Sequence, residues 1–118
     1  MLKQTNRLTK RKEFGYVYKH GKYAYNECLT LIYVPSKLKN IRIGFSISKK
    51  IGKAVIRNKL KRQLREIVRV QLDNLKPNFN YIFVAKPELA ALTYEQIESN
   101  VLDVIKKANL LKWKYFLK

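Results

Sequence analysis

Apolar residues recur at every second position in two stretches of the first half of the chain. Residues 24–34, AYNECLTLIYV, alternate with apolar side chains on both faces, which predicts one strand buried on both sides. One face of it holds Cys28, Thr30, Ile32 and Val34, and the other holds Leu29, Leu31 and Tyr33. Residues 41–48, IRIGFSIS, predict a strand whose outer face is mostly glycine and serine, so a backbone or a ligand can approach it closely. Residues 80–87, NYIFVAKP, predict a third strand that Pro87 ends.

Three other stretches have the helical spacing of apolar residues. The first runs from Thr9, expected to cap it, to about Lys19, and Gly21 closes it. The second follows the turn KKIGK and has an apolar stripe of Ile56, Leu60, Leu64, Ile67 and Val68. The third begins at a capping-box pair, Thr93 and Gln96. Its stripe is Ile97, Val101, Val104, Ile105 and Ala108.

The order helix, strand, strand, helix, strand, helix predicts an α+β fold. We expect a single-domain sandwich in which a small, mainly antiparallel sheet is covered by packed helices. A chain of 118 residues fits one domain, residues 1–118, with a core that needs no disulfides. We expect residues 1–8 to be mobile, and the basic aromatic end LLKWKYFLK to extend the last helix or pack on the body.

The formal net charge is +18, and it is distributed unevenly. Residues 1–70 hold 19 basic and 3 acidic side chains, whereas residues 71–118 hold 7 and 5. A surface that binds a polyanion should therefore come from the first two thirds of the chain, and the last third should be mainly scaffold.

The basic charge is densest in residues 49–69, KKIGKAVIRNKLKRQLREIVR, which contain one acid, Glu66. On a helix, Arg57, Lys61 and Arg65 are four residues apart, so their like charges repel along one edge. Bound phosphates would relieve that repulsion. A merely solvated lysine-rich face is the alternative, but such a helix would interleave Glu at the same spacing. The segment therefore indicates a nucleic acid as partner.

The composition also excludes several classes of protein. Cys28 is the only cysteine, so no internal disulfide or multi-cysteine metal site is expected. The eight acids form no D-x-D or comparable ligand set, and His20 has no second histidine for acid–base catalysis. We therefore expect no catalytic residue and no metal site in the protein. With no signal-peptide core and no apolar run near the roughly 20 residues of a membrane span, we expect a cytoplasmic protein without a membrane partner.

Residues 44–66, GFSISKKIGKAVIRNKLKRQLRE, follow the pattern G-x-S-x-S-K-K-x-G-x-A-V-x-R-N and continue as a basic helix. The flanks agree: F-x-x-V-Y-K-H-G at residues 14–21, A-K-P at residues 85–87, and L-T-Y-E-Q at the last helix. In these residues the chain closely resembles the protein subunit of bacterial ribonuclease P over nearly its whole length. The R-N-R of that family is R-N-K at residues 57–59, where lysine keeps the charge but lacks the planar fork of arginine.

The resemblance implies the protein component of a ribonucleoprotein that removes the 5′ leader of precursor tRNA by endonucleolytic cleavage. In that family a catalytic RNA performs the hydrolysis, so Mg²⁺ would be bound mainly by the RNA subunit. The implied partners are the catalytic RNA and precursor tRNA, with no protein partner required. The family also implies a left-handed strand–helix–strand crossover, although general chirality favours the right-handed form.

The resemblance divides the candidate residues into two surfaces. Facing the catalytic RNA would be Lys49, Lys50, Lys53, Arg57, Asn58, Lys59, Lys61, Arg62, Arg65 and Arg69. Of these, Lys49, Lys50 and Lys53 could serve both surfaces. Meeting the leader would be Phe14, Tyr18, Tyr33 and Lys86, with Arg11 at the edge of the cleft. On spacing alone, packing against the sheet explains Phe14 and Tyr18 more simply. Glu66 and Asn58 are candidates for organising nearby arginines or an outer-shell magnesium ion.

Two other functions compete with this one, and the residues themselves leave only the first of them open. A non-catalytic RNA-binding module, such as a small ribosomal protein, would share the charge, the size and the α+β fold. A stand-alone nuclease would need carboxylate ligands that the chain lacks. Cleft aromatics separate the first alternative from a ribonuclease P subunit, because only the latter would distinguish precursor tRNA from mature tRNA by its leader.

Overall fold

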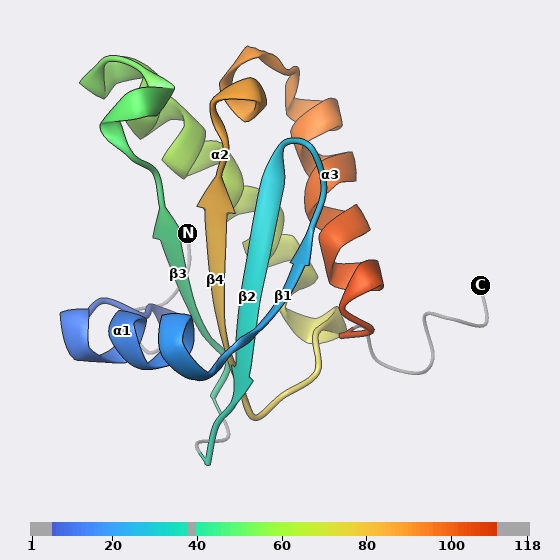
Figure 1. The fold of residues 1–118 in the computed structure, drawn as a ribbon. Helices are drawn as coiled ribbons and strands as arrows, with labels where there is room; N and C mark the ends of the chain where they lie inside the picture. Colours follow the sequence, from blue (N-terminus) through green and yellow to red (C-terminus); the bar gives the residue numbers. More distant parts are fainter. Residues whose placement is uncertain (1–5, 38–39, 111–118) are drawn as a thin grey trace.

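The computed structural model describes residues 6–37 and 40–110. This part of the chain forms three helices and four strands (Figure 1). In order they are α1 (Arg11–His20), β1 (Lys22–Tyr25), β2 (Leu29–Pro35), β3 (Arg42–Ser46), α2 (Ala54–Gln71), β4 (Phe79–Ala85) and α3 (Tyr94–Lys107). Short 3₁₀ turns precede α2 (η2, Lys49–Ile51), follow it (η3, Leu72–Asn74) and follow β4 (η4, Pro87–Ala91). No helix among the described residues is long and apolar enough to span a bilayer.

The four strands form one sheet in the order β1-β2-β4-β3. β1 pairs with β2, and β2 with β4, in antiparallel fashion. β3 pairs with β4 in parallel, which requires the crossover through α2. The expected α+β fold with a mainly antiparallel sheet is confirmed.

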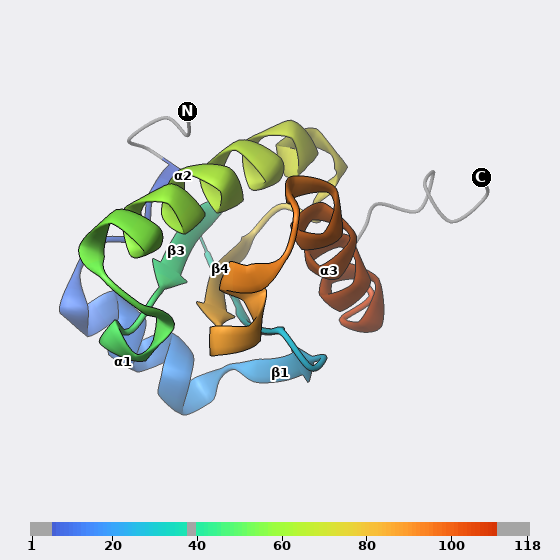
Figure 2. The same ribbon diagram turned by 90° about the horizontal axis from the view of Figure 1, so that it is seen from above.

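The crossover from β3 to β4 runs behind the sheet in the view of Figure 1. Both strands point up the page, α2 lies behind them, and β4 stands to the right of β3 (Figures 1 and 2). A connection that passes behind the sheet and advances to the right is left-handed, the sense that the family resemblance implied.

The sheet is buried on both faces, but unequally. α2 and α3 cover one face and enclose the main core (Figure 2). Its fully buried side chains include Leu29, Leu31, Leu64, Ile67, Tyr81, Phe83, Val101 and Val104. α1 lies across part of the other face, over a smaller cluster of Leu8, Val17, Ile32, Val34 and Ile82. α1 leaves the rest of that second face open.

The prediction of one continuous strand over residues 24–34 is wrong. These residues form β1 and β2, two paired strands joined by a turn at Asn26. The Asn26 side-chain oxygen accepts hydrogen bonds from the backbone N–H groups of Cys28 and Leu29, both 2.9 Å. Such a local side-chain bond gives the backbone an alternative to the strand ladder, and alternation alone does not show it.

The N-terminal expectations also need correction. Thr9 does not cap α1, because the N-cap position is Lys10 and has no side-chain cap bond. Of the segment expected to be mobile, residues 6–8 are held in place: Leu8 is buried, and its N–H donates to the Ile43 carbonyl at 2.8 Å. Residues 1–5 and the basic aromatic residues 111–118 lie outside the described part of the chain.

The helix ends and stripes are otherwise close to expectation. Thr93 and Gln96 form both bonds of the capping box at the start of α3. The expected stripe of α3 is buried throughout. In α2 the stripe is buried except for Ile56, which is 44% exposed in the first turn, and Ile51 of η2 is buried instead. Ile56 in the first turn of α2 does not pack on the core, so the apolar spacing predicts more buried residues in this helix than the structure has.

Gly44 of β3 allows the closest approach across the second face. A Cβ at this position would collide with the ring of Phe14. Gly44→Ala should therefore lower the free energy of unfolding by about 1–3 kcal/mol, the usual cost of overpacking. Gly15→Ala is a matched control, because no atom lies within 4 Å of the added Cβ and α1 favours alanine. Urea unfolding of both variants tests this, and equal stability of the two would contradict it.

Candidate nucleic-acid interface

The outer face of α2 carries most of the predicted RNA-binding residues. Lys53, Asn58, Lys59, Arg62 and Arg69 are exposed, and Lys61 and Arg65 are half-buried. Lys49 and Lys50 are exposed on η2, next to the start of the helix. The buried side of α2 faces the sheet, so these cations form one continuous surface.

Arg57 differs from its neighbours, because the structure also uses it locally. Its Nε donates to the Gly52 carbonyl at 3.1 Å, which ties the turn before α2 to the helix. Gly52 has φ 149, a conformation that side chains rarely adopt, so this turn depends on glycine. Replacing Arg57 would thus disturb the turn as well as remove a charge.

Three cations line one cavity of about 210 Å³ between α2 and the N-terminal segment, which we call the Arg7 cavity: Arg7, Lys61 and Arg65. The Nε atom of Arg7 is buried there and has no hydrogen-bond partner. Burial, and secondarily the charge of Arg7, lower the pKa of Arg65. An anion in this cavity would offset the repulsion between Arg7 and Arg65. The sequence analysis missed Arg7, because it lies in the segment expected to be mobile.

Glu66 is engaged with Arg69 rather than with the rest of the surface. Its two oxygens accept from Arg69 at 2.6 and 3.1 Å, and this hydrogen bonding lowers the pKa of Glu66. The expectation that Glu66 organises a nearby arginine is confirmed for Arg69. Among the described residues, Arg69 is the only cation of α2 in an ion pair, so the other positive charges of the helix are uncompensated.

The part of the second sheet face that α1 leaves open forms a groove of about 520 Å³, which we call the tyrosine groove. It is lined by Tyr18, Tyr23, Tyr25, Thr30, Ile32 and Val84. Tyr23 and Tyr25 are 52% and 65% exposed, and the Tyr23 hydroxyl donates to the Tyr18 carbonyl at 3.0 Å. Together these side chains form one contiguous exposed aromatic patch, and such patches often mark binding sites.

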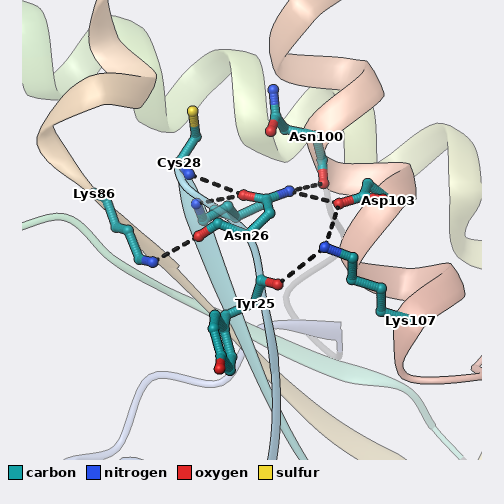
Figure 3. A network of polar contacts seen from close by, with 8 residues as sticks. Tyr25, Asn26, Cys28, Lys86, Asn100, Asp103 and Lys107 are labelled. Atoms are coloured by element: carbon teal, nitrogen blue, oxygen red, sulfur yellow. Dashed lines mark hydrogen bonds and ion pairs between the residues drawn. The ribbon is translucent and has the colours of Figure 1, made fainter.

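Lys86 stands beside the tyrosine groove, directly after β4. Its ammonium lies 5.5 Å from the centre of the Tyr25 ring and donates to the Asn26 carbonyl at 2.6 Å (Figure 3). The cation is therefore held against one wall of the groove. The predicted role of Lys86 at a leader cleft stays a prediction.

The other predicted leader residues do not all lie together. Tyr18 lines the tyrosine groove, whereas Phe14, its neighbour with ring centres 6.4 Å apart, lies over Gly44 and lines the Arg7 cavity. Tyr33 packs against the main core on the opposite face of the sheet, with its ring 6.3 Å from that of Phe79. Its grouping with Phe14 and Tyr18 in one cleft is thus wrong. Arg11 is exposed on α1.

Tyr23 and Tyr25 were left without a role by the sequence analysis. Both point to the groove because they alternate with buried Ala24 on β1, the edge strand that the single-strand prediction overlooked. Two exposed tyrosines on either side of a buried alanine were the available signal. That signal is readable only once the turn at Asn26 is placed.

Uncompensated cations on a crossover helix and an aromatic groove on the far side of the sheet define a small, single-domain α+β protein that binds nucleic acid. No group of three or more His, Cys, Asp or Glu side chains gathers to hold a metal ion in residues 6–37 and 40–110.

Comparison with known proteins agrees with this class and narrows it. The family model described as Ribonuclease P matches residues 2–109. The ribonuclease P protein component of Finegoldia magna is 44% identical over 103 residues, covering 87% of this chain and 90% of that protein. That of Clostridium botulinum is 40% identical over 107 residues, covering 89% and 96%. The solved structure of the Staphylococcus aureus RNase P protein superposes with a TM-score of 0.85 at 30% identity, covering 91% and 98%.

The chain belongs to the ribonuclease P protein family. Its function is that of the protein component of this ribonucleoprotein, the endonuclease that processes the 5′ end of tRNA. Its partner in this complex is an RNA. Membership of the family rules out the alternative of a small ribosomal protein or a similar RNA-binding module.

Proposed function

We propose that the two surfaces divide the work of RNA binding. The face of α2, with η2 and Arg7, binds the catalytic RNA, and the tyrosine groove with Lys86 binds the 5′ leader of precursor tRNA. The observation that carries the proposal is their separation by the sheet: uncompensated cations lie on one side and exposed tyrosines on the other.

The helix suits a folded RNA because its cations are spread along one face and, apart from Arg69, have no acidic partner among the described residues. Phosphates bound there would remove the repulsion between neighbouring cations. The Arg7 cavity adds a site for a single phosphate, where three cations converge. Binding of this kind weakens steeply with salt, because each neutralised phosphate releases counterions.

The tyrosine groove suits an unpaired strand. Bases of single-stranded RNA stack on aromatic rings without regard to sequence, and each stacked base contributes roughly 1–3 kcal/mol. The groove offers three tyrosines, an apolar floor and a cation at one wall. A leader of variable sequence is the ligand that such a surface accepts.

The proposal extends to the binding of magnesium and to the cellular location of the protein. The chain's own described residues do not fit a direct Mg²⁺ site, since Glu66 is bound to Arg69 and no carboxylate cluster forms. Mg²⁺ would therefore be bound mainly by the RNA subunit, where it would supply the charge stabilisation for phosphodiester hydrolysis. The protein would act in the cytoplasm, where precursor tRNA is available.

Reconstitution tests the proposed function. The purified protein is mixed with a bacterial ribonuclease P RNA at low magnesium, and cleavage of a precursor tRNA is followed. We expect correct 5′ processing that neither component supports alone, because the protein's cations replace part of the magnesium that compact RNA needs. Cleavage by protein stripped of RNA, or no gain over RNA alone, would contradict the proposal.

A further inference from the structure

The turn between β1 and β2 makes hydrogen bonds to α3 in addition to the bonds that close the turn itself. The side-chain oxygen of Asn26 closes the turn through the N–H groups of Cys28 and Leu29. Its amide nitrogen donates to the Asp103 carboxylate at 2.9 Å and more weakly to the Asn100 carbonyl at 3.4 Å (Figure 3). One side chain thus links the hairpin to a helix some 75 residues further along the chain.

The same turn supports the outer wall of the tyrosine groove. The Asn26 carbonyl accepts from the Lys86 ammonium at 2.6 Å, and the Tyr25 carbonyl accepts from Lys107 at 3.3 Å. Lys107 in turn pairs with Asp103 at 3.2 Å. The bonds therefore run from α3 through Asn26 to Lys86 and Tyr25, the cation and the ring that form this wall (Figure 3).

Among the described residues, β1 is also tied to α1 by the Tyr23 hydroxyl, which donates to the Tyr18 carbonyl at 3.0 Å. The backbone N–H of Lys86 donates to the Cys28 carbonyl at 3.0 Å. β1 is an edge strand of four residues that pairs only with β2, and its two outward tyrosines are among the most exposed large side chains described. A short edge hairpin held by one neighbour opens easily. The bonds to α3 hold the hairpin from the opposite face of the sheet, so together with the Tyr23 bond to α1 they help to set the width of the groove.

We infer that Asn26 is a positioning residue for leader binding, which holds Tyr25 and Lys86 in place through its bond to Asp103 of α3. The inference rests on the proposed role of the tyrosine groove. It assigns to α3, which carries none of the predicted contacts with RNA, a part in leader binding. The hydrogen bond from Asn26 also lowers the pKa of Asp103, as expected for a donor aimed at the ionised carboxylate.

A pair of variants tests the bond between Asn26 and Asp103. Asn26→Asp keeps the oxygen that closes the turn but sets a second carboxylate against Asp103. Adding Asp103→Asn restores one donor and one acceptor with the roles exchanged. We expect Asn26→Asp to reduce the leader-dependent part of precursor affinity about tenfold, the size of one lost stacking contact. The double variant should recover most of it, and Asn109→Asp, the same change at an exposed site of the same region, should have no effect.

Acid should also rescue the single variant, which separates positioning from general loss of structure. Two adjacent carboxylates repel each other when both are ionised, which raises the pKa of the pair. Lys107, 3.2 Å from Asp103, and Lys86, bound to the Asn26 carbonyl, oppose part of this rise. Below that raised pKa, the shared proton restores the hydrogen bond. The leader-dependent affinity of Asn26→Asp should therefore rise as the pH falls from about 8 to about 5, relative to the wild-type protein.

A double-mutant cycle identifies what Asn26 positions. Lys86→Gln should cost much less in the Asn26→Asp background than in the wild type, whereas Tyr18→Ala should cost the same in both. Additive effects of Asn26→Asp and Lys86→Gln would overturn the inference. So would Asn26→Asp with unchanged leader-dependent affinity, or a swap variant that rescues nothing. If the wild-type protein binds precursor and mature tRNA equally, the proposed function of the groove fails instead.

Discussion

Replacement of Lys61 and Arg65 by glutamine should weaken binding of the catalytic RNA about a hundredfold at moderate salt. Both side chains line the cavity that Arg7 also lines, and neither has a carboxylate partner among the described residues. A charged hydrogen bond contributes about 1.5–3 kcal/mol, so each loss is worth tenfold or more. The slope of log affinity against log salt should fall by about two, one unit for each lost phosphate contact.

The measurement is RNA binding over a range of salt concentrations for both proteins. Lys76→Gln with Lys106→Gln is the matched control, since it removes two charges from the part of the chain that serves as scaffold. Its slope should stay near that of the wild type. An equal change in slope for both double variants would mean that overall charge, and not this face of α2, governs binding.

Replacement of Tyr18 and Tyr25 by alanine should weaken precursor tRNA binding by the assembled enzyme about a hundredfold. Mature tRNA binding should stay nearly unchanged. The two rings form opposite walls of the tyrosine groove, and the loss of two stacked bases has this size. Both side chains are exposed, so the substitutions leave the core intact.

Phe14 is a poorer probe of leader binding, because its ring packs on Gly44 and its removal would open a cavity. Tyr16→Ala is the matched control: Tyr16 is 55% exposed on the same helix, and its ring lies against His20 outside the groove. Equal losses for precursor and mature tRNA, or a Tyr16 effect as large as that of the groove residues, would contradict the assignment.

The elements that depend on a long apolar period could be predicted from the sequence. α2 and α3 are long enough for their stripes to be unambiguous, and the capping box at Thr93 marks where α3 begins. The turn at Asn26 could not be read in the same way. Its flanking residues keep the strand alternation, and a single side chain decides that the backbone turns there.

The candidate site, like the fold, could be predicted from the sequence only in part. The cations of α2 follow from the helical period, so their common face was predictable. Which residues share the other face depends on where α1 crosses the sheet and on which way β2 points its side chains. That register places Ile32 in the groove and Tyr33 in the main core. A shift of one position along a strand moves a side chain to the opposite face of the sheet. The alternation of apolar and polar residues does not show which of the two faces α1 leaves open.

Tethered cleavage tests the division of the two surfaces most directly. In a Cys28→Ser background, an iron chelate is attached at Val55→Cys, which is 79% exposed on α2, or at Tyr23→Cys on the groove wall. Hydroxyl radicals are then generated in the assembled complex with precursor tRNA. The probe on α2 should cut the catalytic RNA, and the groove probe should cut the 5′ leader. Leader cleavage from α2 with none from the groove would contradict the assignment of both faces.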